Sequence, residues 1–286
     1  MGRRATLLAV AFTALLVPAQ AGFAATLELN RTIRTSPFTW TSMSMGDNEG
    51  SAFVPSDNSL WLADDNKNRI YEVDPTTGAL KRKIARSAFN NAPMFGGGPP
   101  AGTDRTNDFE AIAYDRANDV LYVFSGSCCT SSILPTAFRL TRQSGQFQVE
   151  SYQPLPTGAD YTGAAWSPSD GKIYVGKGRD VRSFDYASGT ASPSFRVVGV
   201  TGILGMDFSP DGADLFVTVN SEKLIRINWS TRKVVSGWTL DLTPFGIRDS
   251  RAVAVIGNQF FVSDGYDSRP KGDPLRHAVF VFDATT

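Results

Sequence analysis

Aligned tripeptides recur at five places in the chain, each just before a short apolar run, and four of the five begin with Asp. The five aligned tripeptides are Asp47-Asn48-Glu49, Asp108-Phe109-Glu110, Asp160-Tyr161-Thr162, Gly202-Ile203-Leu204 and Asp249-Ser250-Arg251. Asp is a habitual turn former, so the first positions alone favour a structural role. Turns do not select Glu, and Glu49 and Glu110 are therefore the residues of this set that indicate chemistry.

Further oxygen donors lie where the next predicted strand ends. These residues are Asp64, Asp65, Asn66, Asn220 and Asp264. Carboxylate and amide oxygens with few cations among them suit a hard cation, and calcium takes roughly 6–8 such ligands. The residues expected to hold calcium are Glu49, Glu110, Asn220 and Asp264. The alternative is structural, since Asp and Asn also accept hydrogen bonds from backbone N–H groups in turns.

Several other kinds of site are excluded by what the chain lacks. His277 is the only histidine, so a histidine dyad and a three-histidine zinc site are impossible. We expect His277 to lie partly exposed in a loop, with a proton shuttle as the alternative. The chain has no G-x-S-x-G motif, no phosphate-binding loop and no dinucleotide fingerprint. Its net charge of zero also argues against a nucleic-acid partner.

The acidic tripeptides belong to a repeat of four predicted strands. Residues 47–84 show it best, with alternating apolar strands separated by polar turns such as Pro55-Ser56-Asp57-Asn58. Five such segments align along the chain, and a repeat of this kind indicates a propeller. The sequence predicts an all-β, five-bladed β-propeller, or six blades if residues 86–105 hide a degenerate one.

The last repeat lacks a fourth strand because the chain ends after its third. Residues 25–33 match the pattern of the fourth strand at residues 78–84. We therefore expect the mature N-terminal strand to complete the last blade, which closes the ring and removes an exposed sheet edge.

The long connecting loops should share one face of the ring with the acidic tripeptides. They span residues 34–46, 86–107, 126–135 and 265–276, whereas the turns of the other face are short. Long loops on a rigid scaffold are a common place for binding. We expect a small molecule, a glycan or a protein partner on this face, bound by a monomer. The aromatic residues available for it are Phe38, Trp40, Phe89, Phe95 and Tyr266.

The N-terminus predicts export. Arg3 and Arg4 precede an apolar run at residues 5–17, which is shorter than the ~20 residues that span a bilayer. With the small residues of Ala19-Gln20-Ala21, this pattern is typical of a secretory signal peptide over residues 1–25. A retained anchor is the alternative. The expected mature protein is a single secreted domain, residues 26–286, without a membrane span.

The two cysteines of the chain, Cys128 and Cys129, are adjacent. An exported protein meets oxidising conditions, so they form either a strained vicinal disulfide or two free thiols.

Five segments resemble the repeats of known secreted propellers. The sequences DNEG at 47–50, LWLADD at 60–65 and DFEAIAYD at 108–115 look like blade starts of NHL/SMP-30-like and phytase-like propellers. The sequences FSPDG at 208–212 and LFVTVN at 215–220 resemble the YVTN-type repeat. In the SMP-30-like lactonases a Glu, Asn residues and an Asp hold a divalent ion at the channel mouth. The resemblance implies Glu49, Asn220 and Asp264 for this role, with Glu110 added.

These observations predict a metal-assisted hydrolase of an ester, a lactone or a phosphoester. The cation would polarise the substrate and lower the pKa of a bound water. Asp264, or one of the Asp residues that begin the tripeptides, would accept the proton. Arg251 and Arg248 would neutralise part of the acidic cluster or hold an anionic substrate. One alternative is a non-catalytic binding propeller, which an ion pair between Arg251 and Glu49 would favour. The other is a glycosidase with Glu49 and Glu110 as paired carboxylates.

Overall fold

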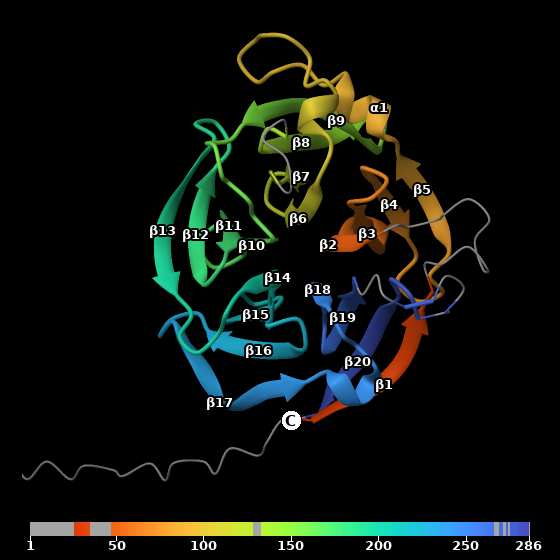
Figure 1. Cartoon of the computed structure of the whole chain (residues 1–286), viewed down its shortest axis with the longest axis vertical. Helices are drawn as coiled ribbons and strands as arrows, with labels where there is room; N and C mark the ends of the chain where they lie inside the picture. Colours follow the sequence, from red (N-terminus) through yellow and green to blue (C-terminus); the bar gives the residue numbers. More distant parts are fainter. Residues whose placement is uncertain are drawn as a thin grey trace, which may run out of the picture.

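The computed structural model describes residues 26–34, 47–127, 133–265, 269–270, 273 and 275–285. Their strands form five four-stranded antiparallel sheets set around a central axis (Figure 1). Consecutive strands are neighbours in four of these sheets, and the fifth has the order β1-β20-β19-β18. This arrangement confirms the predicted all-β, five-bladed propeller.

The strands of each blade run from the axis outward. Blade 1 consists of β2 (Asn48–Val54), β3 (Ser59–Asp64), β4 (Arg69–Val73) and β5 (Leu80–Ile84). Blade 2 consists of β6 (Phe109–Asp115), β7 (Val120–Ser125), β8 (Thr136–Gln143) and β9 (Gln146–Pro154). Blade 3 consists of β10 (Gly163–Ser167), β11 (Lys172–Lys177), β12 (Asp180–Asp185) and β13 (Thr190–Arg196). Blade 4 consists of β14 (Ile203–Phe208), β15 (Asp214–Val219), β16 (Lys223–Asn228) and β17 (Lys233–Asp241). Blade 5 consists of β18 (Ser250–Ile256), β19 (Gln259–Asp264), β20 (Val279–Thr285) and β1 (Thr26–Ile33).

The inner strands need small residues because they crowd together at the axis. A Cβ on Gly50 would lie 2.7 Å from Ala111 Cα of the next blade, and one on Gly205 would lie 2.5 Å from Ala252 Cα. Two cavities of about 10 Å³ remain between these strands, each with room for about one water molecule. The inner strands are thus closely packed around the axis, with little open space between them.

The N-terminal strand closes the ring, as predicted. In β1, Thr32 pairs with Phe280 of β20 and Ile33 pairs with Val279. Ile33 is buried, and Figure 1 shows β1 as the outermost strand of blade 5. Without β1, the backbone groups of β20 would form an exposed edge.

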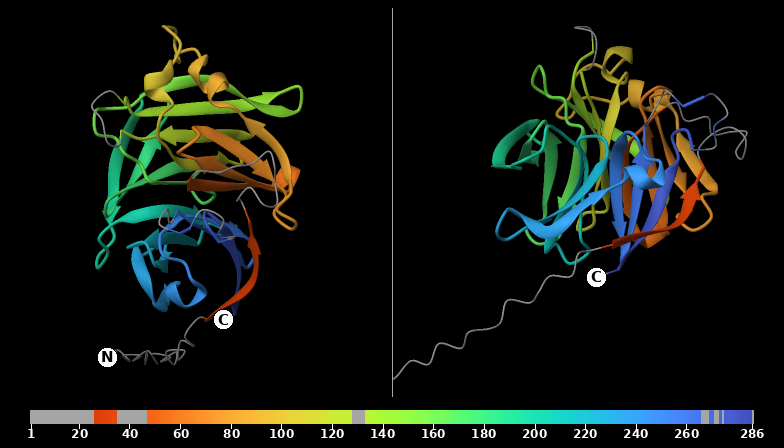
Figure 2. Two further views of the ribbon diagram at one scale, coloured as in Figure 1. Left: turned by 45° about the vertical axis from the view of Figure 1, so that its right-hand side comes forward. Right: turned by 60° about the horizontal axis from the view of Figure 1, so that its bottom comes forward.

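The segment between blades 1 and 2 is not a sixth blade, so that alternative is wrong. It forms α1 (Arg86–Asn90) and the 3₁₀-helix η2 (Thr103–Arg105), with Met94 bridged to Tyr152 of β9. Its Gly- and Pro-rich composition gives it no strand of its own, and Figure 2 shows it outside β9. Two more 3₁₀-helices are η1 (Pro55–Asp57) and η3 (Thr243–Phe245). None of the helices in the described ranges is long and apolar enough to cross a membrane.

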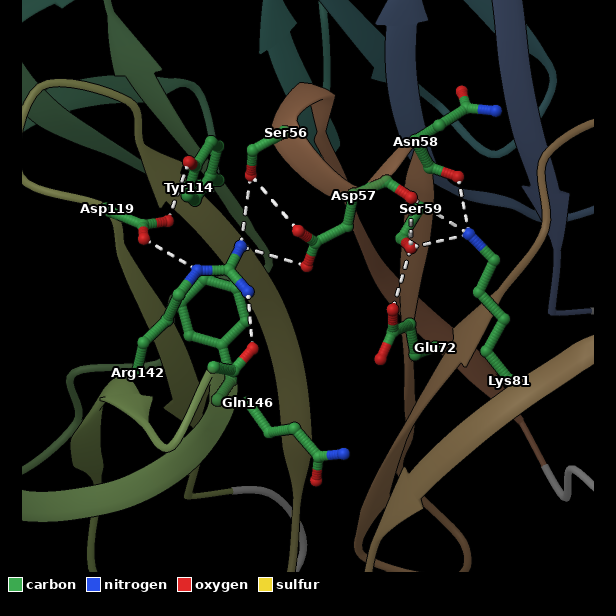
Figure 3. A network of polar contacts seen from close by, with 12 residues as sticks. Ser56, Asp57, Asn58, Ser59, Glu72, Lys81, Tyr114, Asp119, Arg142 and Gln146 are labelled. Atoms are coloured by element: carbon green, nitrogen blue, oxygen red, sulfur yellow. Dashed lines mark hydrogen bonds and ion pairs between the residues drawn. The ribbon is translucent and has the colours of Figure 1, made fainter.

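An arginine clamp joins blades 1 and 2 (Figure 3). The guanidinium of Arg142 stands 4.2 Å from the ring centroid of Phe147 and pairs with Asp119 of its own blade at 2.6 Å. It also crosses the junction to Asp57 of blade 1 at 2.9 Å. From the other side, Arg82 lies over Trp61 and donates a hydrogen bond to the backbone oxygen of Phe147. The stacked guanidinium groups cover the apolar core between the two blades.

Candidate functional site

Acidic side chains from blades 1, 2 and 3 meet on one face of the ring. Strand direction alternates within a blade, so every inner strand begins on the face that also holds the link between its second and third strands. The residues brought to this face are Asp47, Glu49, Asp65, Asp108, Glu110 and Asp160, here named the mouth cluster. The predicted convergence of Glu49 and Glu110 is therefore observed, since the charge of Glu110 acts directly on Glu49.

Asp108, Glu110 and Asp160 form the tightest part of the mouth cluster. Each offers one carboxylate oxygen, and the three oxygens lie within 4.8 Å of one another. Asp108 and Glu110 are buried, whereas Asp160 is half-buried. Gly126 leaves the room for this approach, because a Cβ there would lie 2.4 Å from Asp160 Oδ1 and 2.6 Å from Asp108 Oδ2. This set of oxygens suits a hard divalent cation.

The carboxyl groups of the mouth cluster are held in an environment that disfavours their charge. Burial, followed by the charge of Asp108, raises the pKa of Glu110 well above its ordinary value. Burial, followed by the charge of Glu110, raises the pKa of Glu49 to about 8. Burial and the charge of Asp108 raise the pKa of Asp65 to about 8. In the absence of a cation, pKa values of about 8 leave Glu49 and Asp65 largely protonated near neutral pH.

Arg251 is the cation that borders the mouth cluster in blade 5. Its Nη1 lies 3.2 Å from Glu49 Oε2 and its Nε lies 2.8 Å from Asp249 Oδ2. The negative charge of Glu49 raises the pKa of Arg251, although burial opposes it, and Arg251 in turn lowers the pKa of Glu49. Gly265 makes space for the side chain, since a Cβ there would meet Arg251 Cγ at 2.5 Å. One guanidinium group thus neutralises part of a six-carboxyl cluster.

Asn48, between Asp47 and Glu49 in sequence, is fully buried. Neither its Nδ2 nor its Oδ1 has a hydrogen-bond partner among the residues that the structure describes. Buried amides of native proteins are nearly always hydrogen-bonded, to protein, water or a bound group. Asn48 therefore offers an amide N–H donor and an amide oxygen acceptor next to the mouth cluster.

Asp264 lies at the end of β19 with its oxygens already engaged. Oδ1 accepts hydrogen bonds from the backbone N–H groups of residues 248–249, and Oδ2 accepts two from Arg269 at 3.1 and 2.9 Å. Asp64, at the same position of blade 1, accepts from the backbone N–H of Asp47. These two buried carboxylates hold the starts of the inner strands in place. Both oxygens of Asp264 are thus occupied by hydrogen-bond donors of the protein itself.

Asn220 also holds the backbone at the start of a blade, in this case blade 4. Its backbone is left-handed, with φ of 54°, and its Oδ1 accepts a hydrogen bond from the backbone N–H of Thr201 at 2.6 Å. The amide thus fixes the link that leads into β14. Two of the predicted calcium ligands, Glu49 and Glu110, therefore belong to the mouth cluster. The other two, Asn220 and Asp264, hold the backbone at the start of a blade.

His277 is buried, with 3% of its surface exposed, so the expectation of a partly exposed loop histidine is wrong. Its Nε2 accepts a hydrogen bond from Arg276 Nε at 2.9 Å, and its Nδ1 lies 3.7 Å from Asp47 Oδ1. These contacts hold the imidazole of His277 next to Asp47 of the mouth cluster. The predicted vicinal pair Cys128 and Cys129 falls outside the described residues, as do Phe38, Trp40 and Tyr266.

Asp108 and Asp160 are the site residues that sequence reasoning underrated. Each stands at the first position of its repeat, where a turn-forming role is the simpler interpretation. The available signal was their repeat position, since equal offsets in adjacent blades lie at equal heights on the ring. Their close approach to Glu110 depends on the space that Gly126 leaves in the link after β7. No local sequence pattern shows that this glycine lies beside the three carboxyl groups.

Comparison with known proteins shows the fold and no family. No family model matches the chain, and no curated protein sequence matches it. The chain is similar to the solved structure of Myxococcus xanthus glutaminyl cyclase, with a TM-score of 0.59, 11% identity and coverage of 91% of this chain and 97% of that one. It is also similar to a luciferin-regenerating enzyme, with a TM-score of 0.51, 14% identity and coverage of 92% and 95%. At these identities the likeness shows that the chain is a β-propeller.

Proposed function

We propose that the protein is a divalent-cation-assisted hydrolase with its centre at the mouth cluster. The observation that carries this proposal is the set of three carboxylate oxygens of Asp108, Glu110 and Asp160 within 4.8 Å. Calcium is the cation that such a set of carboxylates, with backbone carbonyls and water completing the shell, fits best. Asp65 supplies further negative charge at the same place.

The raised pKa values of the mouth cluster support a cation-binding role. Buried carboxyl groups that repel one another are unfavourable in the free protein, and a bound divalent charge inverts that effect. The pKa of Glu110 should change most when a cation binds, since the charges of Asp108 and Asp160 act strongly on this carboxyl group. Binding of the cation should therefore release protons from the cluster.

The two sides of the mouth have different chemistry, which suits hydrolysis. The triad of Asp108, Glu110 and Asp160 would hold the cation that polarises a carbonyl or phosphoryl oxygen and activates water. Arg251 borders it with a positive charge that suits an oxyanion, and Glu49, paired with Arg251, is the carboxyl placed to take up or give a proton. The substrates that need these groups are esters, lactones and phosphoesters. Both structurally similar proteins named above are enzymes by name, which agrees with a catalytic propeller.

Metal titration tests the proposal. Calcium added to EDTA-stripped protein at about 100 times its Kd should stabilise the fold by about 2.7 kcal/mol and raise Tm by about 5–10 °C. Asp108→Asn and Asp160→Asn should lose this rise, whereas Asp241→Asn, an exposed acid of β17, should keep it. A wild-type Tm that calcium at about 0.1 M leaves unchanged would contradict the proposed centre.

Activity assays then separate the hydrolase from its alternatives. A panel of nitrophenyl esters, lactones and phosphoesters should show turnover that EDTA abolishes and calcium restores. Calcium binding without turnover would favour a non-catalytic binding propeller, for which the ion pair of Arg251 and Glu49 is the supporting observation. Turnover of glycosides that persists in EDTA would instead favour Glu49 and Glu110 as a glycosidase pair.

We also propose that residues 1–25 are a cleaved signal peptide and that the protein is secreted, since Arg3 and Arg4 precede a short apolar run and small residues. An exported protein would meet calcium concentrations that suit sites with Kd of roughly 10⁻⁴–10⁻³ M. Mass spectrometry of the mature N-terminus in the culture medium tests both proposals; an intact Met1 would refute cleavage.

A further inference from the structure

A groove of about 700 Å³ lies between blades 2 and 3, away from the mouth cluster. In blade 2 it reaches Asp115, the last residue of β6, whereas Glu110 stands near the first residue of that strand. Five residues of strand place these two about 16 Å apart. In blade 3 the groove is bordered by the β10–β11 and β12–β13 turns, on the side opposite the mouth. Its size is within the range of small-molecule and oligosaccharide sites.

Aromatic rings from two blades and a loop line this groove, and three of them contact one another. The centroid of Tyr186 lies 5.4 Å from that of Tyr122 and 5.4 Å from that of Phe95. Phe95 is positioned by its backbone N–H, which donates to the carbonyl of Tyr152, and 41% of its surface is exposed. The hydroxyl of Tyr186 lies 3.0 Å from Ser151 Oγ across the junction. The rings are tilted against one another and form a bent, fixed aromatic wall.

This junction lacks the kind of closure found at its neighbours. Between blades 1 and 2, the arginine clamp of Figure 3 covers the core. Between blades 3 and 4, Trp229 packs against Tyr174 and Phe195 under the guanidinium of Arg232. Between blades 2 and 3, Arg139 pairs with Glu150 of its own blade and leaves the groove beside it open.

The polar groups of the groove are mostly hydrogen-bond donors and hydroxyls. Asp115 and Asp185 both border it, but their oxygens accept hydrogen bonds from their own turns. Lys172 and Thr190 are exposed at its edge, and Ser192 stands on β13 beside them. A ligand therefore meets an aromatic wall on one side and hydroxyl and ammonium groups on the other.

We propose that this groove binds a carbohydrate chain. A pyranose ring has an apolar face of C–H groups that stacks on aromatic side chains, and a rim of hydroxyls that suits Ser, Thr and Lys partners. An apolar peptide segment would leave the hydroxyls and Lys172 unpaired. The balanced charge of the lining gives no basic face for nucleic acid. The proposal is independent of the function assigned to the mouth cluster.

Calorimetric titration of the full-length mature protein with soluble oligosaccharides tests this inference. The probes are cellohexaose, chitohexaose and an alginate-derived oligouronate, all in EDTA so that the mouth cluster has no part. Phe95→Ala should weaken binding at least about 10-fold. Leu134→Ala is the matched control, since Leu134 is also 41% exposed but lies outside the groove, and it should bind as wild type. Lys172→Gln should weaken only the oligouronate, which distinguishes acidic from neutral chains.

Ser192→Trp provides a second variant that does not depend on removing an aromatic ring. Ser192 is exposed on β13, so the indole should fill the groove without disturbing the core, and binding should be lost at unchanged Tm. Asp108→Asn should bind the oligosaccharides normally, which separates this result from failure of the cation centre. The inference is overturned if none of the probes binds at millimolar concentration, or if Phe95→Ala and Ser192→Trp both bind like Leu134→Ala.

Discussion

Glu110 is the residue on which the proposed centre most depends. It is buried beside Asp108 and Asp160, and its pKa is raised by that burial and by their charges. A carboxyl whose pKa is higher in the folded than in the unfolded protein binds more protons when folded. Its contribution to stability therefore falls as pH rises above its unfolded value of about 4.5. The cation that the site is proposed to hold must offset this loss.

Glu110→Gln should accordingly stabilise the metal-free protein at alkaline pH. The substitution removes the unfavourable ionisation, so the unfolding free energy at pH 8 should rise by about 1 kcal/mol or more, or about 2–4 °C in Tm. Near pH 4 the variant should match the wild type. Thermal scans in EDTA at both pH values measure this, with Glu28→Gln on exposed β1 as the control. A variant that is less stable at pH 8 would show that Glu110 is charged and satisfied in the free protein.

Asp264 is predicted to act by holding backbone, and Arg269 is its counter-charge. Arg269→Met leaves the fully buried carboxylate of Asp264 without that partner, which should cost about 3–5 kcal/mol. Arg196→Met, which removes an exposed ion pair to Asp180, should have a much smaller effect on stability. Urea unfolding of both variants provides the measurement. Near-equal costs would mean that the buried carboxylate of Asp264 does not depend on Arg269 as its counter-charge.

At the scale of elements, β1 is the part whose role is most readily tested. Ile33 is buried against blade 5, whereas Leu29 of the same strand is 39% exposed. Ile33→Ala should therefore destabilise the protein by about 2–5 kcal/mol. Leu29→Ala should have a much smaller effect, which makes it a control within the same strand. Similar losses for the two variants in chemical denaturation would contradict the observed register of β1 on β20.

The strands were predictable because their physics is local. Alternating side chains, small residues on inner strands and turn-forming Asp, Gly and Pro recur within each repeat. Ring closure could be predicted by counting strands, because the last repeat has no fourth strand and residues 25–33 have the pattern of one. Contacts through space were less accessible: the burial of His277, the engaged oxygens of Asp264 and the place of Phe95 beside Tyr186 all join distant segments. Repeat position predicted the face on which a residue lies and did not predict its partners.

At the scale of the molecule, the mouth cluster should make stability depend on pH and calcium together. The pKa values of Glu49 and Asp65 are both raised to about 8, from ordinary values of 4.5 and 3.8. In EDTA, Tm should fall as pH rises from about 4 to about 8, because the folded protein must give up protons that it holds more tightly than the unfolded chain. Saturating calcium should remove most of this slope. Scanning calorimetry across that range, with and without calcium, checks both parts, and a flat metal-free profile would refute them.

The pairing of β1 with β20 also constrains the order in which the protein can fold. Asn30 and Asp283 hydrogen-bond at 2.6 Å although 253 residues separate them in the chain. Blades 1 to 4 each form from one continuous segment, so they can assemble while synthesis proceeds. Blade 5 must wait for β20, and until then β1 has no partner in its sheet. The slowest step of folding should therefore be the pairing of β1 with β20, because these strands are far apart in the sequence. Until they pair, β1 is an exposed strand, and a chaperone that covers it would protect the protein from aggregation.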